Sequence, residues 1–388
     1  MSHTFSTPQP EAYKDPKRWV WWFSLGVPVL IGLGPLLMLW RNDPLMLYGP
    51  LVFLYLAVPL ADLVVGEARQ NPPEWAVPQL EADVFYRYLT YALVPMLWAA
   101  FVFAVWFVAT HELPWWGLLA MVLNAGAVGG FGINLGHELG HKHNRLERFL
   151  ALLALAPSGY GHFTIEHNRG HHAEVATPMD CASARMGESI WAFVWREMPG
   201  GVMRAWRLEA QRLRHMGRSA WRADNQFLQG LLITAVLWSG LLLWLGWGVL
   251  PFILLTAMWT NFQLTSANYV EHYGLLRLQQ ADGRYERCEP RHSWNSNHVV
   301  SNWILFQLQR HSDHHAHAAR RYQALRHFDE APQLPNGYAG MFLLAYVPPL
   351  WFAVMNPRLA QAVGRDPARI NFAPGQREAL CQAHGLKA

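Results

Sequence analysis

The sequence predicts an all-α integral membrane protein with about six transmembrane helices and a cytoplasmic cap rich in histidine. Three observations support this fold class. Hydrophobic residues make up 52% of the 388 residues and charged residues only 15%, six segments are apolar over the length of a bilayer, and eleven of the 19 histidines lie in four short boxes. A soluble globular chain of this length carries more charge, so the composition argues against that class.

Six segments reach the roughly 20 residues that a helix needs to cross a bilayer. We expect these helices at 19–40, 45–65, 88–109, 114–135, 226–245 and 249–270. Asp62 is the only charged residue within them. Tryptophans at segment ends, such as Trp19, Trp115 and Trp247, are typical of the membrane–water interface.

The distribution of basic residues predicts the orientation. The loops near 41–44, 110–113 and 246–248 contain a single Lys or Arg residue, Arg41. The opposite side carries Lys14, Lys17, Arg18, Lys142, Arg145 and Arg148. Because positive charge stays in the cytoplasm, both termini are expected there.

Two apolar pieces, 149–160 and 341–355, are too short to span, and we expect them at the interface or packed on the spanning helices. The segment 196–222 combines seven arginines with tryptophan and leucine. That pattern predicts a helix lying on anionic headgroups, and it also suits a docking face for an acidic partner.

Four histidine boxes follow the fourth predicted span and end near the same membrane face. They are HELGHKHN at 137–144, EHNRGHH at 166–172, NYVEHYG at 268–274 and LQRHSDHHAH at 308–317. In the first, second and fourth of these boxes the histidines recur at helical spacing, so each set can face one side of its helix. The candidate ligands are His137, His141, His167, His171, His172, His272, His311, His314 and His315. A lone histidine is usually structural, but nine grouped in this way predict a metal-binding cap.

The number of histidines bears on the metal. HELGH alone is typical of a zinc protease with Glu138 as the base. A catalytic zinc takes about three protein ligands, so nine histidines fit two metals better than one. Imidazole suits Zn, Cu, Fe or Ni, and the spacing does not choose among them. The acids that could accept the second N–H of a ligating imidazole are Glu138, Glu166, Asp180, Glu271 and Asp313.

The boxes resemble those of the integral-membrane histidine-box family of non-haem di-iron enzymes. That family includes membrane desaturases and hydroxylases, and alkane 1-monooxygenases with their xylene monooxygenase relatives. HELGHK, EHNRGHH, LQRHSDHHAH and NYVEHYG are most similar to those of alkane 1-monooxygenases, as are NPPE at 71–74 and SARMGES at 183–189. The resemblance covers roughly residues 45–330.

The resemblance implies a rubredoxin-dependent alkane 1-monooxygenase of the bacterial inner membrane. The nine histidines would hold two non-haem irons, with no haem or flavin and no separate acid or base. O2 would hydroxylate the terminal methyl of medium- or long-chain n-alkanes to 1-alkanols, with electrons from NADH through a rubredoxin reductase and rubredoxin. The implied domains are a cytoplasmic segment 1–18, a membrane catalytic domain 19–355 and a cytoplasmic tail 356–388. No nucleic-acid partner is expected.

Two further sets of residues are expected to serve such a reaction. A water-insoluble substrate would enter from the lipid through a channel lined by Leu60, Ile133, Asn134, Leu264 and Ile304. The chain has no C-x-x-C pair, so we expect rubredoxin to be a separate protein or a missing fused domain. Rubredoxins are acidic as a class, and the predicted docking residues are Lys142, Arg145, Arg148, Arg212 and Arg214.

Three alternatives remain open from the sequence. The first is a membrane fatty-acid desaturase or hydroxylase with the same di-iron site. The second, an intramembrane zinc protease using His137, Glu138 and His141, leaves the later boxes unexplained. The third is a metal transporter, although Asp62 is the only charged residue in the spans.

Overall fold

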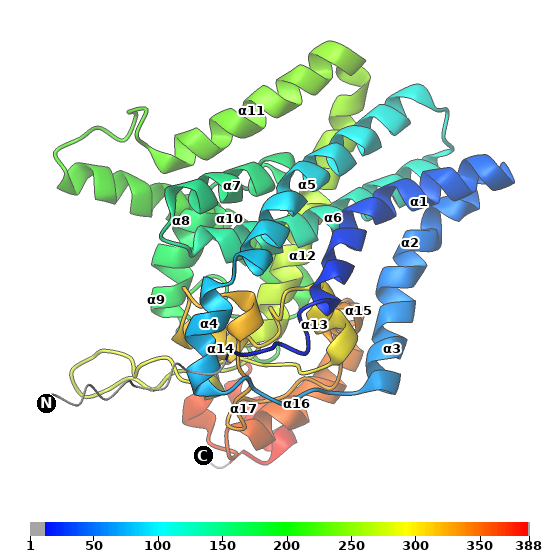
Figure 1. The fold of residues 1–388 in the computed structure, drawn as a ribbon. Coiled ribbons are helices and arrows are strands. Elements are labelled where there is room, and N and C mark those ends of the chain that lie inside the picture. The colour runs from blue at the N-terminus through cyan, green and yellow to red at the C-terminus, as the bar shows by residue number, and fades with distance from the viewer. Residues whose placement is uncertain (1–11, 387–388) are drawn as a thin grey trace, which may run out of the picture.

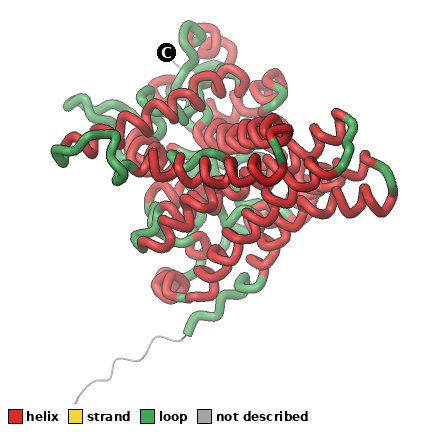
Figure 2. The backbone as a smooth tube through the Cα atoms, turned by 90° about the horizontal axis from the view of Figure 1, so that it is seen from above, coloured by secondary structure: helices red, strands yellow, loops and turns green. Residues whose placement is uncertain are grey.

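The computed structural model describes residues 12–386, and in that part of the chain every helix or strand element is a helix (Figures 1 and 2). Five helical segments are long and apolar enough to cross a membrane: Val20–Arg41, Pro44–Val65, Val84–Thr110, Trp115–Gly140 and Gln226–Leu245. They match the first five predicted spans closely. The all-α, multi-pass fold class is therefore confirmed.

The first two spans are interrupted helices and the next three are continuous. The first consists of η1 (Val20–Leu25) and α1 (Gly26–Arg41), and the second of η2 (Pro44–Tyr48), α2 (Gly49–Val52), η3 (Phe53–Ala57) and α3 (Val58–Val65). The others are α5 (Val84–Thr110), α6 (Trp115–Gly140) and α11 (Gln226–Leu245). η3 is a π-helical turn, an element often found at functional sites.

The sixth predicted span forms helix α12 (Leu250–His272), which has the length of a span but is not among the five most apolar ones. Its second half carries buried polar residues, including Gln263, Thr265, Ser266 and Asn268. α12 runs through the middle of the molecule beside α6 (Figure 1). Because neighbouring helices cover its polar side chains, α12 does not need an apolar surface all round.

Close contact between α6 and α12 depends on small residues in α6. A Cβ on Gly126 would lie 2.3 Å from Trp259, and one on Gly129 would lie 2.4 Å from Thr260 Oγ1. Small residues let helix backbones approach within a membrane. These glycines therefore set the distance between two helices that both carry candidate ligands.

Most of the remaining helices gather around the histidine-bearing ends of α6 and α12, and α13 to α17 lie in the lower part of Figure 1, whereas η7 joins α11 to α12 at the other end. The remaining helices are η4 (Glu74–Ala76), α4 (Val77–Ala82), α7 (Arg145–Leu155), η5 (Ala156–Ser158), α8 (Phe163–Glu166), η6 (His167–His171), α9 (His172–Glu174), α10 (Ile190–His215), η7 (Trp247–Val249), η8 (Pro290–His292), α13 (Val299–Ile304), α14 (His311–Ala316), η9 (Tyr322–Ala324), α15 (Tyr338–Ala345), α16 (Pro348–Ala362), η10 (Pro367–Arg369) and α17 (Arg377–His384).

The two short apolar pieces of the sequence form parts of shorter helices. Residues 149–160 belong to α7 and η5, and α7 packs on α6. Residues 341–355 belong to α15 and α16, whose axes are bent by 119° at the break that precedes Pro348 and Pro349. Proline cannot continue the preceding helix, so the chain turns there.

The single charge in the predicted spans, Asp62, has a structural explanation. Its side chain is buried, and Oδ1 accepts hydrogen bonds from the backbone N–H of Val300 at 2.8 Å and Ser301 at 3.1 Å. These N–H groups begin α13 and have no partner within that helix. Asp62 thus caps α13 and joins the second span to it.

The glycine contact makes a testable prediction. Gly129→Val should lower the free energy of unfolding by about 1–3 kcal/mol, because the larger side chain would force α6 away from Thr260. Thermal unfolding in detergent measures the effect. The matched control is Gly240→Val in α11, where a Cβ would meet no atom within 4 Å. Equal melting temperatures for the two variants would contradict the glycine argument.

Candidate metal centre

The nine predicted histidines converge from four parts of the chain into two groups. Within each group the candidate ligand atoms all lie within 4.8 Å of one another. The five-histidine group contains His137, His141, His167, His172 and His314. The four-histidine group contains His171, His272, His311 and His315.

Ring nitrogens face one another inside both groups. In the five-histidine group, His314 Nε2 lies 2.8 Å from His137 Nε2 and 3.1 Å from His172 Nε2. In the four-histidine group, His311 Nε2 lies 3.2 Å from His272 Nε2 and 2.9 Å from His315 Nε2. Facing nitrogens of this kind are the arrangement that imidazoles adopt around a shared cation.

The boxes do not correspond one to one with the groups, although helical spacing suggested that each box could face one way. His171 and His172 are neighbours in sequence, yet they belong to different groups. His167–His171 forms the π-helical turn η6, whose wider turn places these rings on either side of the site. His311 and His315 likewise belong to one group and His314 to the other.

The protonation states suit metal binding, which requires neutral imidazole. Burial lowers the pKa of the His172 imidazole to about 3. Burial also lowers the pKa of His167, His314 and His315 well below the ordinary histidine value. These rings therefore stay neutral at physiological pH.

Buried nitrogens without partners give a direct test of whether a metal fits. Among the described residues, Nε2 of His141 and Nε2 of His171 are buried and have no hydrogen-bond partner. The other nitrogen of His171, Nδ1, lies 2.9 Å from Asp180 Oδ2. A carboxylate on one nitrogen and an open second nitrogen is the usual state of a metal-binding histidine. The residues therefore fit two metal ions.

Of the five acids expected beside the ligands, Asp180 and Glu271 contact a candidate ligand. Glu271 Oε2 lies 3.4 Å from Nε2 of His311, and Glu271 Oε1 accepts a hydrogen bond from the Tyr338 hydroxyl. Glu271 thus approaches the nitrogen that faces the metal position, which differs from the expected contact with the outer nitrogen.

The other three acids do not orient candidate ligands. Glu138 lies 2.9 Å from Lys142 Nζ, because their i, i+4 spacing brings both into one buried pair. Glu166 lies beside Arg204, and burial raises its pKa to about 7 with a further contribution from Asp180. Asp313 accepts hydrogen bonds from His317, Arg320 and the Arg326 backbone. Spacing alone could not reveal these competing partners.

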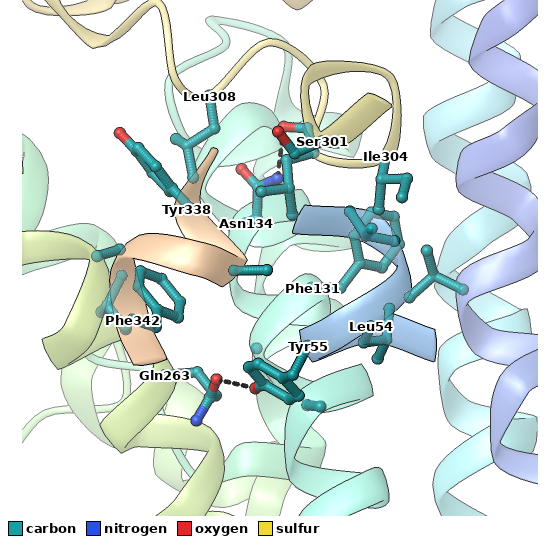
Figure 3. A pocket seen from close by; sticks show the side chains of 18 of the residues that line it. Leu54, Tyr55, Phe131, Asn134, Gln263, Ser301, Ile304, Leu308, Tyr338 and Phe342 are labelled. Carbon is teal, nitrogen blue, oxygen red and sulfur yellow. Dashed lines mark hydrogen bonds between the residues drawn. The ribbon is translucent and has the colours of Figure 1, made fainter. Parts of the chain in front are cut away.

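An apolar pocket reaches the metal centre from the membrane domain (Figure 3). Its empty space is about 970 Å³ when the open mouth is included. His137 and His311, one from each group, line it. Its other walls include Leu54, Tyr55, Val58, Phe131, Ile304 and Phe342.

The pocket contains three of the five predicted channel residues: Asn134, Leu264 and Ile304. Leu60 is 52% exposed on the outside of the second span, and Ile133 packs with Leu155, Tyr160 and Phe163. Neither residue lines this pocket, because each lies on another face of its helix. Counting back from His137 in helical steps, through Asn134 to Phe131, would have found the correct face of α6.

The predicted docking arginines and lysine divide into two kinds. Lys142 is buried in the pair with Glu138, and Arg212 forms an ion pair with the buried Glu209 at 2.6 Å. Neither is free to meet a partner. Arg145 and Arg148 are exposed and line a surface hollow that also includes His141, and Arg214 is exposed on α10.

Comparisons with known proteins agree with this geometry. The sequence model of the fatty acid desaturase family matches residues 113–345. Alkane 1-monooxygenase 1 of Alcanivorax borkumensis is 48% identical over 97% of this chain and 93% of its own length. Alkane 1-monooxygenase of Ectopseudomonas oleovorans is 47% identical over 96% of this chain and 93% of its own length.

A more distant relative shares part of the chain. The hydroxylase component of a xylene/toluene monooxygenase of Pseudomonas putida is 32% identical over 65% of this chain and 65% of its own length. The matches to the alkane 1-monooxygenases are higher in identity and extend over almost all of both sequences. The chain therefore belongs to the alkane 1-monooxygenase family of membrane enzymes, within the larger group that shares the fatty acid desaturase sequence model.

Proposed function

We propose that this protein hydroxylates the terminal methyl group of medium- or long-chain n-alkanes at a centre of two non-haem irons. The reaction consumes the alkane, O2, two electrons and two protons, and yields a 1-alkanol and water. The observation that carries the proposal is the apolar pocket lined by one histidine from each group, His137 and His311. The pocket would bring an unreactive C–H bond to the metal centre.

The residues of this chain would bind the metal ions and orient the substrate. A terminal C–H bond has no acidity and no leaving group, so bound iron would supply the oxidative chemistry that side chains lack. The neutral imidazoles provide nitrogen ligands for it, and the Asp180 carboxylate fixes the orientation of His171. The apolar wall excludes water and directs the methyl group toward His137 and His311.

The far end of the pocket supports a limit on substrate length. The hydroxyl of Tyr55 donates a hydrogen bond to Gln263 across that end (Figure 3). Gln263 precedes Glu271 by eight residues on α12, which is about 12 Å along the helix axis. An alkane with its methyl group at the histidines would therefore extend toward the Tyr55 ring.

The pocket also favours an alkane over the acyl substrates of a desaturase or fatty-acid hydroxylase. Among the described residues that line it, none is a lysine or arginine that could receive a carboxylate. A carboxylate buried without such a partner is costly. Product analysis with n-octane and with acyl substrates separates the two functions, and a zinc protease or transporter would give no alcohol.

We further propose an inner-membrane location with both termini in the cytoplasm, and rubredoxin as the electron donor. NADH would supply the electrons through a rubredoxin reductase. Arg145 and Arg148 support this docking proposal because they are exposed beside His141 of the five-histidine group. Arg214 adds a third exposed cation on α10.

The decisive experiment combines metal analysis with a reconstituted assay. Purified protein should contain about two irons per chain, as two histidine groups require. It should convert octane to 1-octanol when rubredoxin, its reductase and NADH are present. Zinc alone, or no alcohol with a competent electron donor, would overturn the proposal.

Removal of one ligand should affect one group. His315→Ala should reduce the metal content from about two ions to about one and abolish hydroxylation, because the four-histidine group loses a nitrogen. Elemental analysis and product formation measure the two effects. The control is His111→Ala. His111 follows the C-terminal end of α5 and belongs to neither histidine group, so this variant should retain both metals. Full metal content in the His315 variant would contradict the assignment.

Truncation at the far end of the pocket should change substrate preference. Tyr55→Leu removes the ring and its bond to Gln263, so the rate with hexadecane relative to octane should rise by roughly tenfold, which is about 1.4 kcal/mol. Competition between the two alkanes measures the ratio. Leu56→Ala changes the adjacent, exposed side chain and should leave the ratio unchanged. An unchanged ratio in the Tyr55 variant would show that the ring does not limit chain length.

Charge reversal should test the docking proposal. The double variant Arg145→Glu, Arg148→Glu should raise the KM for rubredoxin by roughly threefold to tenfold and weaken its dependence on salt. The control is the same reversal at Arg41, the last residue of α1. Metal content should stay normal in both proteins. If rubredoxin kinetics are identical in the two variants, docking uses another surface.

A further inference from the structure

The motif NPPE at 71–74 lies outside the histidine boxes and contacts residues 326 and 327, which follow α14 in the sequence. The Asn71 amide Nδ2 donates to the carbonyl of His327 at 2.9 Å, and Asn71 Oδ1 accepts from the backbone N–H of His327 at 2.7 Å. The same motif contributes Glu74, which forms an ion pair with Arg326. The NPPE loop is thus fixed to residues 325–327 at two points.

Arg310 connects this pair of segments to the metal centre. It directly precedes His311 and is 2% exposed. Its guanidinium donates to the carbonyl of Leu325 at 2.7 Å and to the carbonyl of Ala68 at 2.8 Å. It also reaches Asn71 Oδ1 at 3.5 Å. A buried cation bound to carbonyl and amide oxygens of two loops fixes their positions relative to His311.

The position of α14 matters because this helix is only six residues long and supplies ligands to both groups. A helix of that length is not stable by itself, so its tertiary contacts must hold it. Metal ligands need placement within about 0.5 Å. Segment 325–327 also reaches the middle of α14, because the Arg326 backbone donates to Asp313 at 2.9 Å.

We propose that Asn71 and Arg310 act together as positioning residues for the metal centre, by holding residues 325–327 and the start of α14 in register. They form the Asn71–Arg310 clamp. In the clamp, Asn71 contacts the His327 backbone, and Arg310 contacts Leu325 and directly precedes His311. The clamp would therefore set the direction of His311, His314 and His315. This inference rests on the proposed two-metal centre, and it assigns a function to the NPPE motif.

Metal affinity tests the clamp without any turnover. The full-length protein and its Asn71→Leu and Arg310→Lys variants would be stripped and titrated with Fe²⁺ or Co²⁺ in competition with a chelator. Each variant should bind about 10–100-fold more weakly, as expected when a group that orients ligands is lost. The visible spectrum of bound Co²⁺ should also change, because the ligand geometry changes.

A conservative variant separates positioning from general destabilisation. Asn71→Asp keeps an oxygen that accepts from the His327 N–H and from Arg310, but it loses the donor to the His327 carbonyl. Its metal affinity should lie between those of the wild type and Asn71→Leu. Asn225→Leu is the control, because Asn225 likewise bonds to backbone groups, at the start of α11. It should lower the melting temperature and leave the metal affinity unchanged.

The outcomes distinguish the clamp from the centre itself. If wild-type protein fails to bind two metals, the proposed function is at fault. If wild-type protein binds two and Asn71→Leu and Arg310→Lys bind them with the same affinity and the same Co²⁺ spectrum, the clamp is overturned. If Asn225→Leu weakens metal binding as much as Asn71→Leu does, the effect is general instability and the clamp is likewise overturned.

Discussion

The structure depends on the convergence of nine imidazoles in a buried space at the histidine-bearing ends of α6 and α12. Burial keeps the rings of His167, His314 and His315 neutral, and neutrality makes them ligands. The candidate ligand atoms of each group lie within 4.8 Å of one another, an arrangement that suits a bound cation. The helices that carry the rings must therefore be held by contacts elsewhere.

Those contacts come from the packing of the membrane helices and from the cap. Glycines in α6 let α12 approach, which brings His137 and His272 to the same level of the molecule. Hydrogen bonds of Asp180, Asn71 and Arg310 then orient the shorter segments that cannot hold themselves. The candidate metal centre is thus held by helix packing and by hydrogen bonds from residues outside the histidine boxes.

The apolar pocket joins this polar centre to the lipid-embedded part of the protein. One face of α6 supplies both environments, because Phe131 and Asn134 line the pocket and His137 belongs to the five-histidine group. The polar pair of Tyr55 and Gln263 lies at the other end. Under the proposed function, a substrate with no polar group would be bound by its shape and by the exclusion of water.

The sequence by itself determined the all-α membrane class, the first five spans, and the nine histidines, because hydrophobic length and helical spacing are local properties. It also led to Asp180, which follows the second box closely. Only the tertiary structure decided how the nine rings divide into groups, that Glu138 and Lys142 pair with each other, and that Leu60 and Ile133 face away from the pocket. These features depend on helix rotation and on partners distant in sequence. Spacing within one helix cannot determine either.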